Sequence, residues 1–275
     1  MRSATGPIVA LFASLASACV GEIAGAVAVA VGDPDAGDED PGIDAAADAS
    51  PGAPDAAPPG LVWKAVLMTG DDSISAFDNA REAMKALFEA DGVLDEDTIQ
   101  LSRDGALQTG GVRATSVDSF ADALLELAVG DGDGCVVFMT SHGSPSGFYI
   151  RDQNELTPTR LDRILDDACG DRPTVALISA CYSGVFVDPA AQPNRIILTA
   201  AREDRTSFGC SAEAEYTYWD GCLIDRFTAS DTWAALYDDV TACIEAKEGG
   251  GFTPSLPQGF FGADVRDLPI FHRRE

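Results

Sequence analysis

Two short apolar runs, each followed by a chemically reactive residue, constrain the fold of this chain more than any other feature. The first run, Cys135–Thr140, leads after one serine to His142, and the second, Thr174–Ser179, leads after one alanine to Cys181. Runs of this length without polar alternation are typical of strands buried on both faces of a parallel sheet. Open α/β sheets place their ligands beyond the carboxyl ends of the strands. We therefore expect an imidazole and a thiol to lie together at one edge of a sheet.

The rest of residues 61–275 alternates between further strands and amphipathic helices. Strands are expected at Trp63–Met68, Thr98–Leu101 and Arg195–Thr199, a small hairpin from Gly147, and a last strand within Pro254–Ile270. Helices are expected from Phe77 to Ala90, from a Thr115 cap to Val129, from a Thr157 cap onward, and in two pieces ending near Ala229 and Lys247. This alternation predicts an α/β three-layer sandwich with a mostly parallel central sheet and helices on both faces.

The amino-terminal segment has the features of an export signal. An apolar stretch from Ile8 to Ala18 precedes Cys19, which favours a signal peptide over residues 1–19 with a lipoprotein-type cleavage site and lipidation of Cys19. An ordinary signal peptide cut later, at small residues after Ala26, is the alternative. Residues 20–60 are rich in Asp, Ala, Gly and Pro and cannot bury enough apolar surface to fold, so we expect a disordered tether.

The charge and the cysteines of the chain indicate which binding partners and which disulfides to expect. The formal net charge is −27, which argues against nucleic acid. The spacing of His and Cys residues suggests no metal site, and no cofactor is expected. Besides Cys19 and Cys181, five cysteines can pair if the protein is exported; we expect Cys135 to stay a buried thiol and Cys210 to bridge to Cys222.

A thiol beside an imidazole suits amide hydrolysis. In this hypothesis Cys181 attacks the carbonyl carbon, His142 protonates the leaving amine and then activates water, and the N–H groups of Gly143 and Cys181 bind the oxyanion. A lone cysteine at a strand end is more often a core residue than a nucleophile. The chain has only two histidines, and the other, His272, lies near the carboxyl end.

The residues around this pair resemble those of the legumain-like cysteine peptidases, which belong to the caspase-like group. The resemblance rests on Thr140-Ser-His-Gly-Ser144, Ile178-Ser-Ala-Cys-Tyr-Ser-Gly184 and Leu198-Thr-Ala-Ala201, in this order, and is strengthened by Thr206–Cys210. It covers the chain from about Trp63 to Ile270 and implies a caspase-like fold. It also implies that His142 and Cys181 form the catalytic dyad.

The resemblance extends to further site residues. Gly143 matches the oxyanion-hole glycine, and Asp72 falls where the family has an asparagine that orients the histidine. Ser207 and Asp220 match part of the pocket for the side chain before the cleaved bond, which implies cleavage after Asn or Asp. The chain departs from the family at Tyr182, where legumain has an acid.

Three arginines are candidates for recognising the substrate side chain. The basic pocket residue of the family has no clear counterpart, and Arg81 is the nearest candidate. Arg202 and Arg205 are candidates for binding an acidic substrate side chain, because a guanidinium binds a carboxylate through two hydrogen bonds. Their alternative interpretation is that of ordinary surface arginines.

The sequence thus favours an exported cysteine endopeptidase that acts on peptide or protein substrates and is held at a membrane, periplasmic or cell-surface, through a lipid on Cys19. Three alternatives stay open. A transpeptidase would use the same dyad, and a catalytically silent caspase-like domain would serve as a binding module at the cell surface. A small-ligand-binding doubly wound domain would need a Gly-rich first turn, where this chain has Gly70-Asp71-Asp72.

Overall fold

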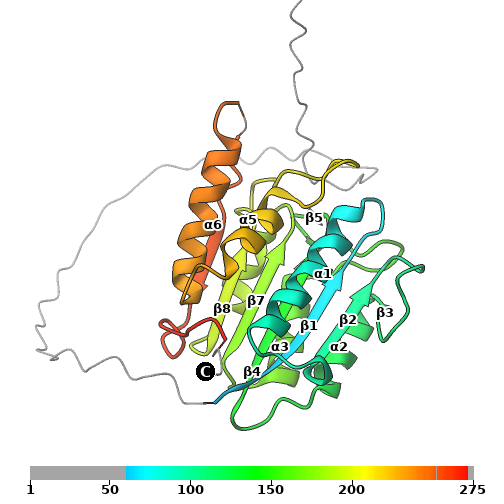
Figure 1. The fold of residues 1–275 in the computed structure, drawn as a ribbon, viewed down its shortest axis with the longest axis vertical. Helices are drawn as coiled ribbons and strands as arrows, with labels where there is room; N and C mark the ends of the chain where they lie inside the picture. Colours follow the sequence, from blue (N-terminus) through cyan, green and yellow to red (C-terminus); the bar gives the residue numbers. More distant parts are fainter. Residues whose placement is uncertain (1–59, 252, 272–275) are drawn as a thin grey trace, which may run out of the picture.

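The structure, a computed structural model, describes residues 60–251 and 253–271. The predictions for the signal peptide, for Cys19, for the tether up to residue 59 and for His272 lie outside these residues. Figure 1 shows the described part as one central sheet with helices on both sides.

The main sheet has seven strands in the order β3-β2-β1-β4-β7-β8-β9. Neighbouring strands are parallel except at one edge, where β9 runs antiparallel to β8. These strands are β1 (Val62–Thr69), β2 (Thr98–Ser102), β3 (Arg113–Ala114), β4 (Asp133–Thr140), β7 (Thr174–Ser179), β8 (Arg195–Thr199) and β9 (Gln258–Phe261). The strands β5 (Gly143–Ser144) and β6 (Gly147–Phe148) form a separate hairpin directly after β4.

Helices cover the two faces in separate layers (Figure 1). The helices α1 (Ser75–Ala90), α5 (Tyr218–Phe227) and α6 (Trp233–Glu248) pack on one face, where inward residues of β1, β4, β7 and β8 complete an apolar core. The helices α2 (Val117–Glu126) and α3 (Pro158–Cys169) pack on the opposite face over a second core. Short helical segments η1 (Asp95–Asp97), η2 (Ser183–Phe186) and α4 (Val187–Ala190) complete the connections.

The predicted three-layer α/β sandwich is confirmed, and several element bounds agree closely. β7 and β8 have the same bounds as the predicted strands Thr174–Ser179 and Arg195–Thr199. Thr157 caps α3, as predicted, by accepting a hydrogen bond from the N–H of Arg160. One cap was predicted wrongly. Ser116 rather than Thr115 caps α2, because Ser116 and Ser119 satisfy each other's backbone N–H groups.

Both disulfide expectations were wrong. Cys135 is bonded to Cys169, and Cys222 is bonded to Cys243, with Cα–Cα distances of 6.0 and 5.9 Å. Cys135 is the third residue of β4 and belongs to the core on the face covered by α3, whose last residue is Cys169. Cys222 lies on α5 at its contact with α6, which carries Cys243. Helix packing, rather than loop length, selects both pairs.

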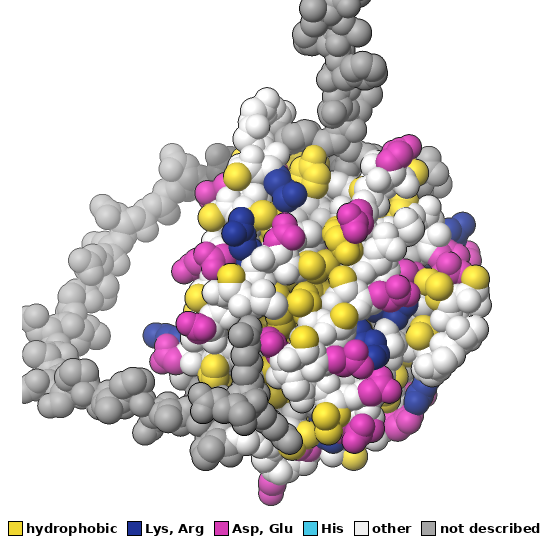
Figure 2. Space-filling model, in the orientation of Figure 1, with side chains coloured by type: hydrophobic (Ala, Val, Ile, Leu, Met, Phe, Trp, Pro, Cys, Tyr) yellow, Lys and Arg dark blue, Asp and Glu magenta, His cyan; other side chains and the backbone are white. Residues whose placement is uncertain are grey.

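The surface agrees with the acidic composition. Figure 2 shows acidic side chains spread over the face in view, where they outnumber the basic ones. Among the helices of the described part, we find none with the length and apolar character needed to cross a bilayer.

Candidate active site

His142 and Cys181 follow neighbouring strands at equivalent positions. β4 and β7 are paired in register so that Thr140 lies opposite Ser179, and the N–H of Ser141 donates a 3.1 Å hydrogen bond to the carbonyl of Ser179. Each reactive residue lies two positions beyond its member of the Thr140–Ser179 pair. The structure therefore brings the two predicted reactive residues to the same edge of the sheet.

Phe77 of α1 packs against both of these residues. Its ring meets the imidazole of His142 edge-on, with centroids 5.2 Å apart and an angle of 87° between the planes. Phe77 also shares a small apolar cluster with Cys181 and Cys210. One aromatic side chain thus joins the imidazole and the thiol on the α1 side of the sheet. From the sequence, Phe77 is recognisable only as part of the helix's apolar face.

Gly143 is required by the close approach of two chain segments. A Cβ at this position would overlap the carbonyl oxygen of Cys181 and would lie 2.9 Å from the Cβ of Ala180. The residue after the imidazole therefore packs directly on the backbone that carries the thiol. This contact suits the predicted role of Gly143 in an oxyanion hole, because a glycine lets backbone groups approach the reaction centre.

The thiol of Cys181 is enclosed by the loop that follows β8. Cys181 is only 1% exposed, and the N–H of Ser207 donates a hydrogen bond to its sulfur at 3.3 Å. The Ser207 hydroxyl lies 3.7 Å from the same sulfur. Tyr182 has a left-handed backbone, with φ of 57°, and its N–H donates to the carbonyl of Arg205 at 2.7 Å. The structure thus places Ser207 and Tyr182, both predicted to bind substrate, beside the thiol.

The loop after β1 brings a serine to the imidazole. Ser73 has its hydroxyl 3.5 Å from Nε2 of His142, while its N–H donates to the Asp71 carboxylate at 2.6 Å. Asp72, which was predicted to orient His142, accepts a 2.9 Å hydrogen bond from Arg151. Ser73, one residue after the predicted one, is therefore the side chain that the structure sets against Nε2.

Asp220 lies beneath the strand ends rather than on a surface open to substrate. Its side chain is fully buried in the first turn of α5 and accepts a 2.8 Å hydrogen bond from the Thr140 hydroxyl. Burial raises the pKa of Asp220 to about 6, although hydrogen bonds from Thr140, Ser179 and Thr217 oppose the shift. The structure thus places Asp220 beneath the end of β4, and its part in a substrate pocket stays a prediction.

Arg81 is also internal. It is 1% exposed on α1, and its Nε donates a 2.9 Å hydrogen bond to Asp78, while a terminal nitrogen donates to Gln100 of β2. A guanidinium bound in this way neutralises a buried carboxylate. In the structure Arg81 forms an ion pair with Asp78, and its part in a substrate pocket stays a prediction.

The two arginines after β8 share one acid. Arg202 binds Asp204 through two nitrogens, at 2.6 and 2.9 Å, and Arg205 lies 3.5 Å from the same carboxylate. Both arginines are already engaged within the loop that encloses the thiol. Binding of an acidic substrate side chain by this pair stays a prediction.

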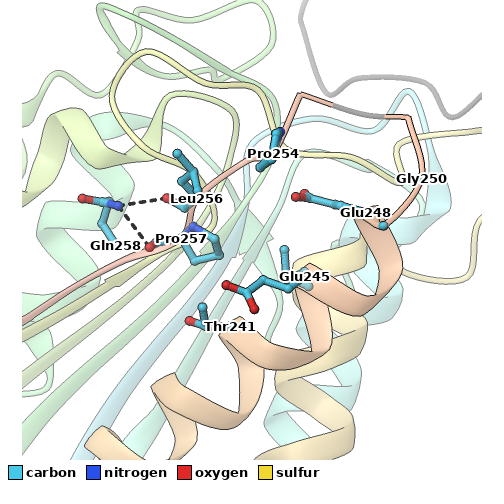
Figure 3. Close-up of a pocket in the computed structure, with 10 residues that line it drawn as sticks. Thr241, Glu245, Glu248, Gly250, Pro254, Leu256, Pro257 and Gln258 are labelled. Carbon is cyan, nitrogen blue, oxygen red and sulfur yellow. Dashed lines mark hydrogen bonds between the residues drawn. The ribbon is translucent and has the colours of Figure 1, made fainter.

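A cavity of about 530 Å³ lies elsewhere, between the end of α6 and the segment before β9 (Figure 3). Glu245 and Glu248 point into the space between these segments, and Pro254, Leu256 and Pro257 line the opposite side. Neither His142 nor Cys181 is among its lining residues, so this cavity is separate from the reactive pair. In the part of the chain that the structure describes, no group of three His, Cys, Asp or Glu side chains could hold a metal ion.

Comparison with known proteins agrees with this geometry. The model of the Peptidase C13 family matches residues 124–246. This match spans both His142 and Cys181 and supports a cysteine peptidase. No curated protein matches the chain in a sequence search.

The solved structures similar to this chain show the same fold. Caspase-1 from Spodoptera frugiperda superimposes with a TM-score of 0.54 and 10% sequence identity, covering 73% of this chain and 86% of the caspase chain. The expected caspase-like fold is thereby confirmed.

Proposed function

We propose that this chain is a cysteine endopeptidase in which Cys181 is the nucleophile and His142 the general acid and base. The observation that carries the proposal is the pairing of Thr140 with Ser179, which sets the imidazole and the thiol at matching positions beyond two parallel strands. The family match over the same residues supports it independently.

The reaction follows from the chemistry of these two groups. The Cys181 thiolate adds to the carbonyl carbon of the peptide bond, and the N–H groups of Gly143 and Cys181 stabilise the oxyanion. The C–N bond breaks as His142 gives its proton to the leaving amine, which leaves a thioester on Cys181. His142 then takes a proton from water, which attacks the thioester and releases the acid product and the thiol. An amine in place of water would give a transpeptidase product.

The resemblance to the legumain-like peptidases also suggests which side chain the substrate carries before the cleaved bond. Cleavage after Asn or Asp is our proposal for the preferred side chain, and Ser207 and Tyr182 are the proposed contacts because both lie beside the thiol. Asp220 and Arg81, which the sequence also suggested for this pocket, are both buried.

Export and membrane attachment are part of the same proposal. The two disulfides described above suit an oxidising compartment, because intracellular thiols are normally kept reduced. We propose that Cys19 carries the lipid. Metabolic labelling with an alkyne-bearing fatty acid should mark the full chain and should not mark a Cys19→Ala variant; equal labelling of both would place the lipid elsewhere or exclude it.

The test of the activity uses the full chain with its Cys181→Ala and His142→Ala variants. Purified proteins are incubated with a peptide library, and cleavage sites and products carrying an added amine are identified by mass spectrometry. We expect the parent to cleave after a narrow set of residues and both variants to lose at least about a thousandfold in rate. Equal cleavage by parent and variants would assign the activity to other residues. An inert parent whose thiol resists alkylation would favour the binding-module alternative.

A further inference from the structure

The cavity between the end of α6 and the segment before β9 lies at the same edge of the sheet as the reactive pair. Its lining residue Gln258 is the first residue of β9 and pairs with Thr199, the last residue of β8. Because β4, β7 and β8 are parallel neighbours, their carboxyl ends share this edge, and His142 and Cys181 follow two of them. The cavity is therefore two strands away from Cys181 along one edge.

The loop after β8 connects the wall of the cavity with the thiol. The N–H of Arg202 donates a 2.9 Å hydrogen bond to the carbonyl of Ser255, in the segment that lines the cavity. Five residues further along the same loop, the N–H of Ser207 donates to the sulfur of Cys181. Five extended residues span at most about 18 Å. A peptide held at Cys181 therefore reaches the cavity with a side chain about five residues from the cleaved bond.

The cavity carries two carboxylates and no cation among its lining residues. Glu248 is only 6% exposed, and its Oε2 accepts a 2.9 Å hydrogen bond from the N–H of Ser255, while its Oε1 has no partner among the described residues. Glu245 points into the same space (Figure 3). The neighbouring Lys247 lies instead over the ring of Tyr218, 5.6 Å from its centroid. The negative charge of the cavity is thus not balanced by the lysine of the same helix turn.

The opposite wall is apolar and is held in place by side-chain hydrogen bonds. Pro254, Leu256 and Pro257 form it, and Leu256 is 37% exposed with a left-handed backbone, at φ of 55°. The amide of Gln258 donates to the carbonyls of Leu256 and Pro257 at 3.0 and 3.1 Å (Figure 3). The hydroxyl of Tyr237 also donates to the carbonyl of Pro257, at 3.0 Å. A wall fixed in this way costs little ordering when a ligand binds.

We propose that this cavity is an accessory substrate site, which binds an Arg or Lys side chain of the peptide about five residues from the cleaved bond. This inference rests on the proposed function. The aliphatic stem of such a side chain packs against Leu256 and the prolines, and its charged head binds Glu245 and Glu248. A wholly apolar ligand would desolvate both carboxylates without a partner, which is costly. The described residues also lack the three ligands that a metal ion needs.

The first measurement is peptide binding to the full chain carrying Cys181→Ala, which cannot form the thioester. Fluorescein-labelled peptides of Ala and Gly around a central Asn carry one Arg, placed in turn at each of about six positions on either side. Each has a partner peptide with citrulline, which has nearly the same shape without the charge. We expect the Arg peptide to bind about tenfold more tightly than its citrulline partner at one position, as for hydrogen bonds to a charged group. Equal binding of both peptides at every position would overturn the inference.

Three variants connect this preference to the cavity. Glu245→Gln removes one charge from an exposed position, and Glu248→Gln removes the second. Asp238→Asn is the matched control, because Asp238 is an exposed acid of α6 that does not line the cavity. Glu245→Gln should lower the preference for Arg about threefold, the double variant should abolish it, and the control should retain it. A preference that survives Glu245→Gln undiminished would overturn the inference, even if Glu248→Gln does not fold.

The second measurement separates this inference from the proposed function. The same peptides are given to the parent, and kcat/KM is compared between Arg and citrulline at each position. We expect the same position to be preferred, with the same dependence on Glu245. If the parent cleaves nothing, a Glu245-dependent preference in binding still supports a site for basic peptides, and the peptidase proposal alone fails. Cleavage that is indifferent to Arg would show that the cavity does not serve the substrate and would overturn the inference.

Discussion

Asp78 accepts hydrogen bonds from the strand-end hydroxyls of Ser102 and Thr69, and Asp220 accepts one from Thr140, but among the described residues only Asp78 also has an arginine partner. The paired acid lies under the ends of β1 and β2. The acid without a cation lies under the strands that carry His142 and Cys181. Asp220 is therefore the one of these two buried acids that has no cationic partner among the described residues.

Arg81→Met should destabilise the fold rather than alter substrate preference. It leaves Asp78 buried without its cation, and breaking a buried ion pair in this way costs about 3 to 5 kcal/mol. Denaturant unfolding measures this cost, with Arg226→Met as the control because Arg226 is exposed at the end of α5. A stable Arg81→Met protein with a changed side-chain preference would restore Arg81 to the substrate pocket.

Gly143→Ala should abolish most of the activity while the protein still folds. The added Cβ meets the carbonyl of Cys181, so the backbone of the imidazole loop or of the thiol turn must move. A displacement near 1 Å at a reaction centre can lower the rate about a hundredfold. Gly105→Ala is the matched control, because no heavy atom lies within 4 Å of a Cβ at that position. Equal loss in both variants would point to a general effect of alanine rather than to the site.

Ser73→Ala should weaken catalysis more than Asp72→Asn does. The Ser73 hydroxyl lies 3.5 Å from Nε2 of His142, whereas Asp72 is engaged by Arg151. Losing one hydrogen bond to the imidazole, worth on the order of 1 kcal/mol, should lower kcat/KM about fivefold. Steady-state rates on one peptide, measured for both variants, distinguish the two residues. The reverse ranking would support the predicted orienting role of Asp72.

Much of the fold could be predicted because buried parallel strands leave a clear signal. The uninterrupted apolar runs before Cys181 and at Arg195–Thr199 define β7 and β8 to the residue. The placement of His142 and Cys181 followed from the same runs, since parallel strands end at one edge of a sheet.

Features that depend on helix packing were not predictable in the same way. Asp220 was matched to a substrate pocket by resemblance alone, because the sequence does not show that the first turn of α5 lies beneath the end of β4. The partners of Cys135 and Cys222 depend likewise on which helix faces which strand or helix. One signal was present: Thr69, Thr140 and Ser179 each end a buried strand, and buried hydroxyls need a hydrogen-bond partner.

Stability should fall as pH rises through the titration of Asp220. The pKa of this carboxyl is raised from 3.8 to about 6, so the folded state holds the proton more tightly than the unfolded state does. Its favourable contribution is therefore complete below about pH 4 and is lost as pH rises through about 6; at 1.36 kcal/mol per pKa unit, it amounts to about 3 kcal/mol. Asp220→Asn should flatten this part of the stability curve, and Asp225→Asn, at an exposed acid of the same helix, should not.

The measurement is the free energy of unfolding in urea at a series of pH values, with the difference between parent and variant taken at each pH so that the other carboxyls cancel. A difference that does not change with pH would show that Asp220 keeps one protonation state throughout. If the predicted fall is found, the ionised form of Asp220 belongs to the less stable form of the protein. Such a cost at a reactive site is common, because the geometry that catalysis needs is seldom the most stable one.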